Sequence, residues 1–249
     1  MEDETLAKVP WWPAPGGPAR VIVPIVASTL QEALRQARDI ATTDAELVEW
    51  RADCLQMALP SDTLAVIAKG LHDLVCPRPL IFTWRTADEG GRAASDEHYE
   101  SVTRCAIDER AADLVDIQMR HPAAQSLIKA ALAVGLPVVG SWHAIDAAPT
   151  RQEIVTALTD AEQAGVSVAK VAIMPQHATD VVALLSATAE RSATARIPLL
   201  TMAMGSLGRA SRVFGYVFGS QATFATVDGE SAPGQPSLTS LRDTWASFE

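Results

Sequence analysis

The chain has 249 residues, of which 48% are hydrophobic and 20% are charged, a balance typical of a globular protein rather than a disordered one. Its formal net charge of −10 argues against a general nucleic-acid binder and against attraction to an anionic membrane surface, because both need an excess of cationic side chains. The three cysteines, Cys54, Cys76 and Cys105, form no CxxC pattern and no zinc spacing, which favours a reducing compartment.

The opening segment, residues 1–20, reads MEDETLAKVPWWPAPGGPAR. It is acidic and rich in proline and glycine, so it lacks the basic start and the apolar stretch of a signal peptide. The sequence contains no run of about 18 apolar residues, the length that a membrane-spanning helix needs. We therefore expect a soluble cytoplasmic protein that opens with an irregular N-terminal extension.

Short apolar runs, which predict strands, alternate with longer segments of helical periodicity. In chain order these elements are a strand at 20–26, a helix at 29–42, strands at 46–52 and 79–85, a helix at 95–111, strands at 113–119 and 136–142, a helix at 150–165, a strand at 167–173, a helix at 177–192, and strands at 197–203 and 222–227.

Eight strands that alternate with helices in a chain of this length predict a single (β/α)8 barrel. A doubly wound open sheet uses the same units and is the main alternative. The composition does not change abruptly after residue 20, and no long linker interrupts the pattern. We therefore predict one catalytic barrel domain, residues 21–249, behind an extension formed by residues 1–20.

Charged side chains occur in or at the ends of four of the predicted strands, where an apolar interior would not accept them alone. They are Glu49, Arg51 and Asp53 on one face of the second strand, Arg85 at the end of the third, His143 at the end of the fifth, and Lys170 within the sixth. Chemistry in a barrel collects at the carboxyl ends of the strands, so we expect these side chains to converge on one mouth.

The position of Lys170 can be interpreted in two ways. The residue is either a structural lysine that forms an ion pair across the barrel, for instance with Glu49, or a nucleophile in a dry site. His143 suits proton transfer near neutral pH, yet a histidine near a strand end is often a satisfied core residue. The remaining histidines fall in predicted helices or loops and are expected at the surface; they are His72, His98, His121 and His177.

The loops contribute further candidates. Glu89 follows the third strand in RTADEGG, where a solvated loop acid is the default, although Gly90 and Gly91 would let the backbone turn back over a pocket. Arg51, Arg85 and Arg212 are either surface residues or clamps for a carboxylate. Residues 205–215 match neither glycine-rich nucleotide motif. The polar segment 219–235 suits a lid, in which Ser231 and Gln235 either bond a ligand or form a surface turn.

With these residues in view, the chain resembles the type I 3-dehydroquinate dehydratases, the Schiff-base enzymes of the shikimate pathway and aromatic amino acid biosynthesis. Six motifs in the same order carry the resemblance from about residue 21 to the C-terminus. They are VEWRAD (48–53), FTWRTADEGG (82–91), SWH (141–143), AKVAIMP (169–175), TMAMGSLGRASRVFG (201–215) and GSQATFATVDGESAPGQ (219–235). The chain departs from the family after its histidine, where Ala144, Ile145 and Ala148 replace the usual Asp-Phe and a later Thr.

The resemblance implies a role for each candidate. Lys170 matches the Schiff-base lysine, His143 the general acid and base, Glu89 the acid that orients this histidine, and Arg212 the arginine that holds the substrate carboxylate. The polar residues around the bound ring match Glu49, Arg51, Arg85, Ser231 and Gln235, and its apolar walls match Met202, Met204 and Phe224. The family uses no metal and no organic cofactor, acts on the small molecule 3-dehydroquinate and commonly forms homodimers.

Two other functions fit the same residues. A class I aldolase would share the Schiff-base lysine and would cleave a carbon–carbon bond instead of eliminating a hydroxyl. A non-catalytic relative would only bind a hydroxy acid, which the presence of Lys170, His143 and Glu89 together disfavours.

Overall fold

The computed structural model describes Trp12, residues 19–227 and residues 234–248. Strands and helices alternate along the described chain, as the sequence predicts. The strands are β1 (Arg20–Ile25), β2 (Leu47–Arg51), β3 (Leu80–Thr83), β4 (Leu114–Gln118), β5 (Val138–Ala144), β6 (Val168–Ile173), β7 (Leu199–Ala203) and β8 (Ala222–Phe224).

Eight α-helices occur in the described part of the chain, and four short 3-10 helices lie in its loops. The α-helices are α1 (Leu30–Ala41), α2 (Ser61–Val75), α3 (Asp96–Asp108), α4 (Ala124–Ala133), α5 (Arg151–Gln163), α6 (Ala178–Ser192), α7 (Arg209–Phe214) and α8 (Leu238–Ala246). The 3-10 helices are η1 (Ala52–Cys54), η2 (Ala87–Glu89), η3 (Ser206–Gly208) and η4 (Gly215–Phe218). Within the described ranges, no helix has the length and apolar character needed to cross a membrane.

Polar caps determine where several helices begin. Thr29, Ser95 and Ser237 each accept a hydrogen bond from a backbone N–H in the first turn of the helix that follows. Thr150 forms a capping box with Glu153 at the start of α5, which satisfies two backbone donors at once. These caps lie in loops after strands, so each strand passes into its helix at a position that the sequence specifies.

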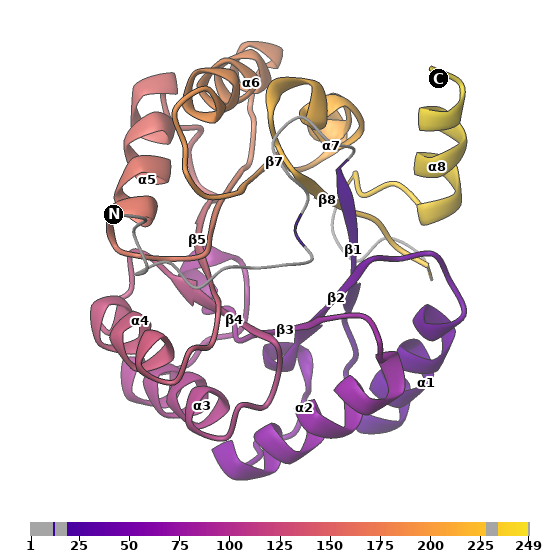
Figure 1. Cartoon of the computed structure of the whole chain (residues 1–249), viewed down its shortest axis with the longest axis vertical. Helices are drawn as coiled ribbons and strands as arrows, with labels where there is room; N and C mark the ends of the chain where they lie inside the picture. Colours follow the sequence, from indigo (N-terminus) through magenta and orange to yellow (C-terminus); the bar gives the residue numbers. More distant parts are fainter. Residues whose placement is uncertain (1–11, 13–18, 228–233, 249) are drawn as a thin grey trace.

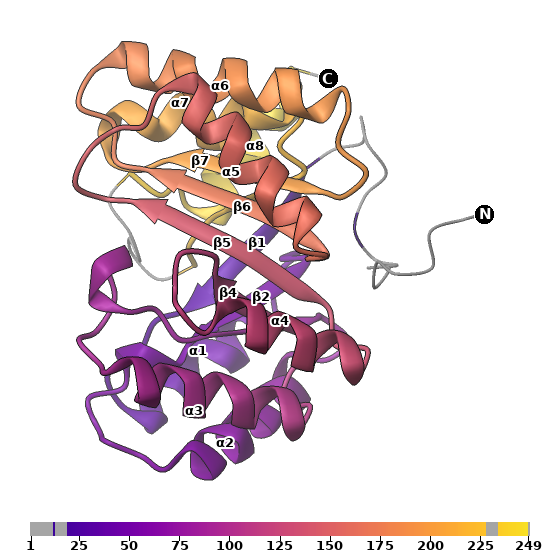
Figure 2. The same ribbon diagram turned by 90° about the vertical axis from the view of Figure 1, so that its left-hand side faces the viewer.

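The strands form one parallel sheet in the order β7-β6-β5-β4-β3-β2-β1-β8. A backbone hydrogen bond of 2.8 Å from Gln221 N to Leu199 O links the segments that lead into β8 and β7, so the barrel is nearly closed. The helices surround the strands in Figure 1, and Figure 2 shows β5 and β6 running side by side in the same direction. The prediction of a (β/α)8 barrel is confirmed.

The barrel interior is built in layers, because every second residue of a strand faces inward. One buried cluster includes side chains near the starts of six neighbouring strands, namely Leu47, Ile81, Leu114, Val139, Val168 and Leu200. Two residues further along the same strands stand Glu49, Thr83, Asp116, Ser141, Lys170 and Met202. An apolar layer thus supports a polar one, and this polar layer forms the base of the site.

Trp12 belongs to the same buried cluster and is only 8% exposed. It is the one described residue of the N-terminal segment before Ala19, and its indole adds a large apolar surface to the barrel interior. Burial of a tryptophan of this kind is worth several kcal/mol, so the segment that carries it contributes to the stability of the barrel.

Candidate active site

A cavity of about 380 Å³ opens at the carboxyl ends of the strands. Eleven of the twelve predicted site residues line it: Glu49, Arg51, Arg85, Glu89, His143, Lys170, Met202, Met204, Arg212, Phe224 and Gln235. The twelfth, Ser231, lies outside the described residues. The expected convergence of these side chains on one mouth of the barrel is therefore confirmed, while their individual roles stay predictions.

Lys170 stands in the middle of β6 and is 5% exposed. Its Nζ atom lies 3.3 Å from Glu49 Oε1 and 3.4 Å from Asp116 Oδ2, and it sits 4.8 Å from the centre of the Phe224 ring. The ion pair with Glu49 is the contact that a structural lysine would make. The same nitrogen also lines the cavity, so the two readings of Lys170 do not exclude one another.

His143 and Glu89 form a close pair beside this lysine. The distance from His143 Nδ1 to Glu89 Oε2 is 2.7 Å. Burial, together with the positive charges of Arg85 and Lys170, holds the pKa of His143 well below 6.5. Burial also raises the pKa of Glu89 to about 7, although the Arg85 guanidinium opposes this rise. An ionised Glu89 would accept a hydrogen bond from Nδ1–H of a neutral imidazole and leave Nε2 as a base.

A tight loop places Glu89 in the barrel mouth. Glu89 ends the short helix η2, and Gly90 follows with a φ of 82°, a conformation that favours glycine. A Cβ atom at Gly91 would lie 2.1 Å from the carbonyl oxygen of Arg85, so only glycine allows the loop to return this close to β3. The Gly90-Gly91 pair therefore brings an acid that would otherwise be solvated into a buried position, where Glu89 is 7% exposed.

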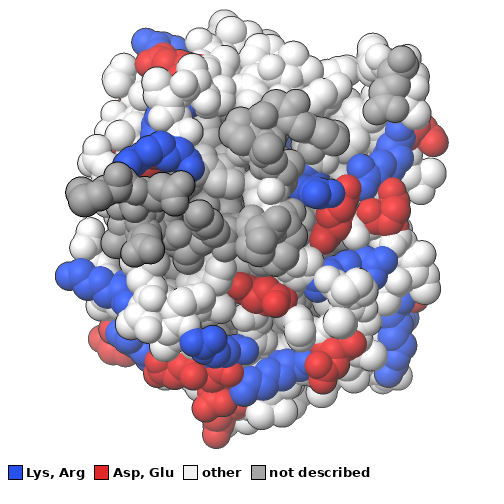
Figure 3. Space-filling model, viewed as in Figure 1, with Lys and Arg blue, Asp and Glu red and all other residues white. Residues whose placement is uncertain are grey.

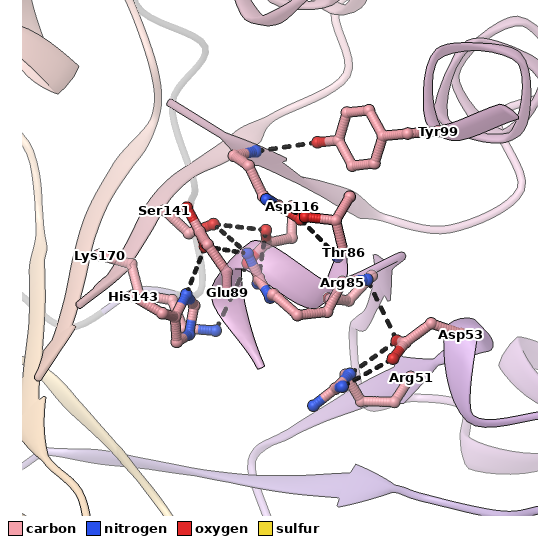
Figure 4. Close-up of polar contacts among 12 residues, drawn as sticks. Arg51, Asp53, Arg85, Thr86, Glu89, Tyr99, Asp116, Ser141, His143 and Lys170 are labelled. Carbon is pink, nitrogen blue, oxygen red and sulfur yellow. Dashed lines mark hydrogen bonds and ion pairs between the residues drawn. The ribbon is translucent and has the colours of Figure 1, made fainter. Parts of the chain in front are cut away.

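Arg85 and Asp116 join the lysine to the histidine pair (Figure 4). Arg85 Nη1 donates to Glu89 Oε2 at 2.9 Å and to Ser141 Oγ at 2.8 Å, and Arg85 Nη2 lies 2.7 Å from Asp116 Oδ1. Ser141 donates in turn to Asp116 Oδ1 at 2.6 Å. The Arg85 side chain is thus engaged with internal acids.

Asp116 and Ser141 are site residues that the sequence reasoning missed. The signal was present in the predicted strand 113–119, because Asp116 lies two residues after Leu114 and shares its inward face. Ser141 has the same relation to Val139 and is the direct neighbour of Lys170 in the sheet register. Strand alternation, applied to these two strands as it was to residues 49–53, would have found both.

The remaining predicted residues form the rim and walls of the cavity. Arg51 makes two hydrogen bonds of 2.7 Å with the carboxylate of Asp53. Arg212 is 3% exposed and lies 3.7 Å from the sulfur of Met202 through its Nη1 atom. A buried arginine in an apolar wall suits an anionic ligand, because its charge is poorly screened there.

A second cavity, of about 630 Å³, is also lined by the His143–Glu89 pair. The two cavities share Glu89, His143 and Ile145. The residues after His143 at which the chain departs from the usual sequence of the family all line this second cavity; they are Ala144, at the end of β5, and Ile145 and Ala148 in the loop that follows.

The expectation that His121 lies at the surface was wrong. Its side chain is 6% exposed, its ring centre lies 4.1 Å from that of Tyr99, and Nε2 lies 3.2 Å from Asp96. The residue follows β4 in a loop that folds back over α3, which no local pattern in the sequence indicates. His121 lines the second cavity and not the first.

The charges outside the cavities are dispersed. Lysine, arginine and acidic side chains are interspersed over the face of the molecule drawn in Figure 3. Across the described residues, no three His, Cys, Asp or Glu side chains are grouped so as to hold a metal ion.

Comparison with known proteins finds one family along almost the whole chain. The family model for type I 3-dehydroquinase matches residues 21–248. A 3-dehydroquinate dehydratase of Enterococcus faecalis is 38% identical over 237 residues, which cover 94% of each chain. A catabolic 3-dehydroquinate dehydratase of Acinetobacter baylyi is also 38% identical, over 231 residues that cover 90% of this chain and 84% of the relative.

Solved structures show the same similarity. The 3-dehydroquinate dehydratase of Geobacillus kaustophilus superposes with a TM-score of 0.89 at 29% identity, over 96% of this chain and 97% of the other. The type I 3-dehydroquinate dehydratase of Clostridium difficile, solved with covalently modified comenic acid, gives a TM-score of 0.86 at 28% identity, over 93% of this chain and 92% of the other.

Proposed function

The chain belongs to the type I 3-dehydroquinase family, and from this premise we propose that it dehydrates 3-dehydroquinate to 3-dehydroshikimate, a step of the shikimate pathway, through a Schiff base on Lys170. The observation that carries the proposal is the position of Lys170 Nζ in one cavity with the His143–Glu89 pair and the buried Arg212. These groups supply a nucleophile, a base and an anion clamp around the same cavity.

The chemistry explains why a lysine is needed. Removal of a proton next to a ketone leaves a carbanion, and an iminium formed with the ketone accepts that charge as a neutral enamine. Lys170, as the neutral amine, attacks the ketone carbon, and the ketone oxygen leaves as water. Because the walls around Lys170 are apolar on the side of Met202 and Phe224, little water competes for the iminium.

His143 then handles the protons. Its neutral ring takes the proton from the carbon next to the iminium, and it returns a proton to the departing hydroxyl group, which leaves as a second water molecule. Water finally hydrolyses the conjugated iminium and frees Lys170. Glu89 fixes the ring with its proton on Nδ1, so the other nitrogen is available to the substrate.

Arg212 holds the substrate carboxylate in this proposal, and Gln235 and Arg51 bond the hydroxyl groups of the ring. Binding energy from these remote contacts orients the ketone toward Lys170. All steps use side chains of this chain, so we expect activity without an added metal or organic cofactor, and the same turnover after treatment with a chelator. Light scattering of the purified protein tests the homodimer that the family resemblance implies.

The decisive experiment is reductive trapping. Borohydride added together with 3-dehydroquinate should give a stable adduct on the protein, and peptide mass mapping should place this adduct on Lys170. Lys170→Ala is the matched control, which should fold, form no adduct and lose turnover.

An enzyme that stays unmodified and active after borohydride treatment would refute the Schiff base. Release of a shorter carbon fragment, instead of the absorbance rise of a conjugated product, would favour an aldolase. Binding of the substrate without either product would indicate a non-catalytic protein.

A further inference from the structure

Asp116 meets Lys170 from beneath the cavity. It stands in the middle of β4, is 1% exposed, and places Oδ2 3.4 Å from Lys170 Nζ. Glu49 lies 3.3 Å from the same nitrogen and lines the cavity. Among the described residues, Asp116 does not belong to the cavity lining. A ligand in the cavity can therefore reach Glu49 but meets Asp116 only through Lys170.

The carboxylate of Asp116 is held firmly in place. Arg85 Nη2 lies 2.7 Å from Oδ1, and Ser141 Oγ donates to the same oxygen at 2.6 Å, so the oxygen that faces Lys170 is the other one. Burial by itself would raise the pKa of Asp116, but Arg85 and Lys170 outweigh burial and hold the pKa below its usual range. Asp116 is thus a fixed anion at neutral pH.

We propose that Asp116 is the fixed counter-ion of the Lys170 nitrogen through all the cationic stages of Schiff-base catalysis. This inference rests on the proposed function. The reacting nitrogen is cationic as the iminium before and after the elimination, and Asp116 stabilises this form without touching the substrate. Glu49, which shares the nitrogen, is free to exchange contacts with the ligand.

The charge on the nitrogen changes in a definite order. The neutral amine forms the C–N bond with the ketone carbon, and the ketone oxygen leaves as water with one hydrogen from the amine and one proton from solvent, so the nitrogen keeps one hydrogen and becomes positively charged. Loss of a proton from carbon to His143 then moves an electron pair into the enamine and leaves the nitrogen neutral. Departure of the hydroxyl group with that proton, as water, restores the iminium. A fixed anion beside the nitrogen favours this last step.

The arrangement also couples the two halves of the site. Arg85 is shared between Asp116 and Glu89, so one guanidinium balances both the counter-ion of Lys170 and the partner of His143. Removal of the Asp116 charge would leave the positive charge of Arg85 compensated by Glu89 alone, which opposes a cation on the Lys170 nitrogen still further.

Asp116→Asn tests the proposal, because the amide keeps the shape and removes the charge. We expect kcat to fall at least about tenfold, with a KM that changes less than about threefold. The pH range over which borohydride traps the iminium should shift to lower pH by about one unit, since a cation at the nitrogen is less favoured. Asp113→Asn, just before the start of β4, is the matched control; its carboxylate accepts a hydrogen bond from Leu80 N at 2.8 Å and is remote from the cavity residues.

The control variant should keep the kcat and the pH range of the parent enzyme. A merely structural Asp116 would lower the melting temperature and leave the pH range of trapping unchanged, and this result would overturn the proposal. Ser141→Ala provides a second test if Asp116→Asn does not fold. It keeps the charge of Asp116 and removes the hydroxyl group that donates a hydrogen bond to Asp116 Oδ1. A kcat loss of about threefold supports the fixed counter-ion, and parental kcat overturns it.

Trapping on the parent enzyme separates this inference from the proposed function. If the parent enzyme forms no adduct with 3-dehydroquinate, the Schiff base itself is refuted. If the parent forms the adduct and Asp116→Asn forms it over the same pH range, only the role of Asp116 is refuted.

Discussion

Glu89 offers the sharpest quantitative prediction, because an acid in this position destabilises the fold when it ionises. Its pKa is raised from 4.5 to about 7, first by burial and against the attraction of Arg85. Below pH 4.5 the side chain is protonated in both the folded and the unfolded chain. As the pH rises toward 7, the unfolded chain ionises and the folded one does not, so the free energy of unfolding falls.

The size of the effect follows from the two pKa values. Each pKa unit corresponds to about 1.4 kcal/mol, so the ionised Glu89 lowers the free energy of unfolding by roughly 3 kcal/mol above pH 7. About 2.5 kcal/mol of this change falls between pH 5 and pH 8. Glu89→Gln removes the titration and keeps the shape. Relative to the parent protein, the variant should therefore gain about 2.5 kcal/mol of stability between pH 5 and pH 8, while it loses turnover.

Urea unfolding at pH 5 and pH 8, followed by tryptophan fluorescence, measures this difference. Comparison of the variant with the parent at each pH cancels the titration of the groups that do not contact Glu89. Asp88→Asn serves as the control, since it removes an exposed acid from the same turn and should differ from the parent equally at both pH values. A stability difference for Glu89→Gln that stays constant within about 0.5 kcal/mol between the two pH values would refute the reasoning.

Three further predictions follow from the site and the core. The value of kcat/KM should rise as the pH increases through about 7, because ionised Glu89 fixes the His143 tautomer. The residual kcat/KM of Glu89→Gln should not show this rise. Arg212→Ala should lower kcat/KM for 3-dehydroquinate about a hundredfold in steady-state assays, because a buried charge-assisted contact to the carboxylate is lost; parental kcat/KM would contradict the clamp. Trp12→Ala should lower the free energy of unfolding by about 3 kcal/mol in urea and leave kcat unchanged, since Trp12 packs in the barrel cluster and not in the substrate cavity; unaltered stability would contradict its role in the core.

The fold could be predicted from the sequence because hydrophobic periodicity and the number of strands are local properties of the chain. The layers of the barrel follow from the same alternation that placed Glu49, Arg51 and Lys170 on inward faces. Long-range partners are different. Lys170 and Asp116 are 54 positions apart, and their contact depends on the register in which β4, β5 and β6 align, which no single strand encodes.

Burial was the other property that residue type alone did not reveal. Glu89 reads as a solvated loop acid until the close return of Gly91 to Arg85 is known, and that return depends on tertiary packing. His121 was misjudged for the same reason, because its burial arises from the aromatic contact with Tyr99 across two elements. Ser231 stays a prediction, since it lies outside the described residues.

The His143–Glu89 pair lines two cavities, and this has a consequence for inhibition. A compound that fills the larger, polar cavity would contact His143 and Glu89 while the substrate occupies the cavity of Lys170. It would therefore lower kcat without competing with the substrate for its binding site. Ala144, Ile145 and Ala148, small or slender where the family usually carries Asp, Phe and Thr, shape this cavity. Such a compound would gain its selectivity from the residues after His143 at which the chain departs from the usual sequence of the family.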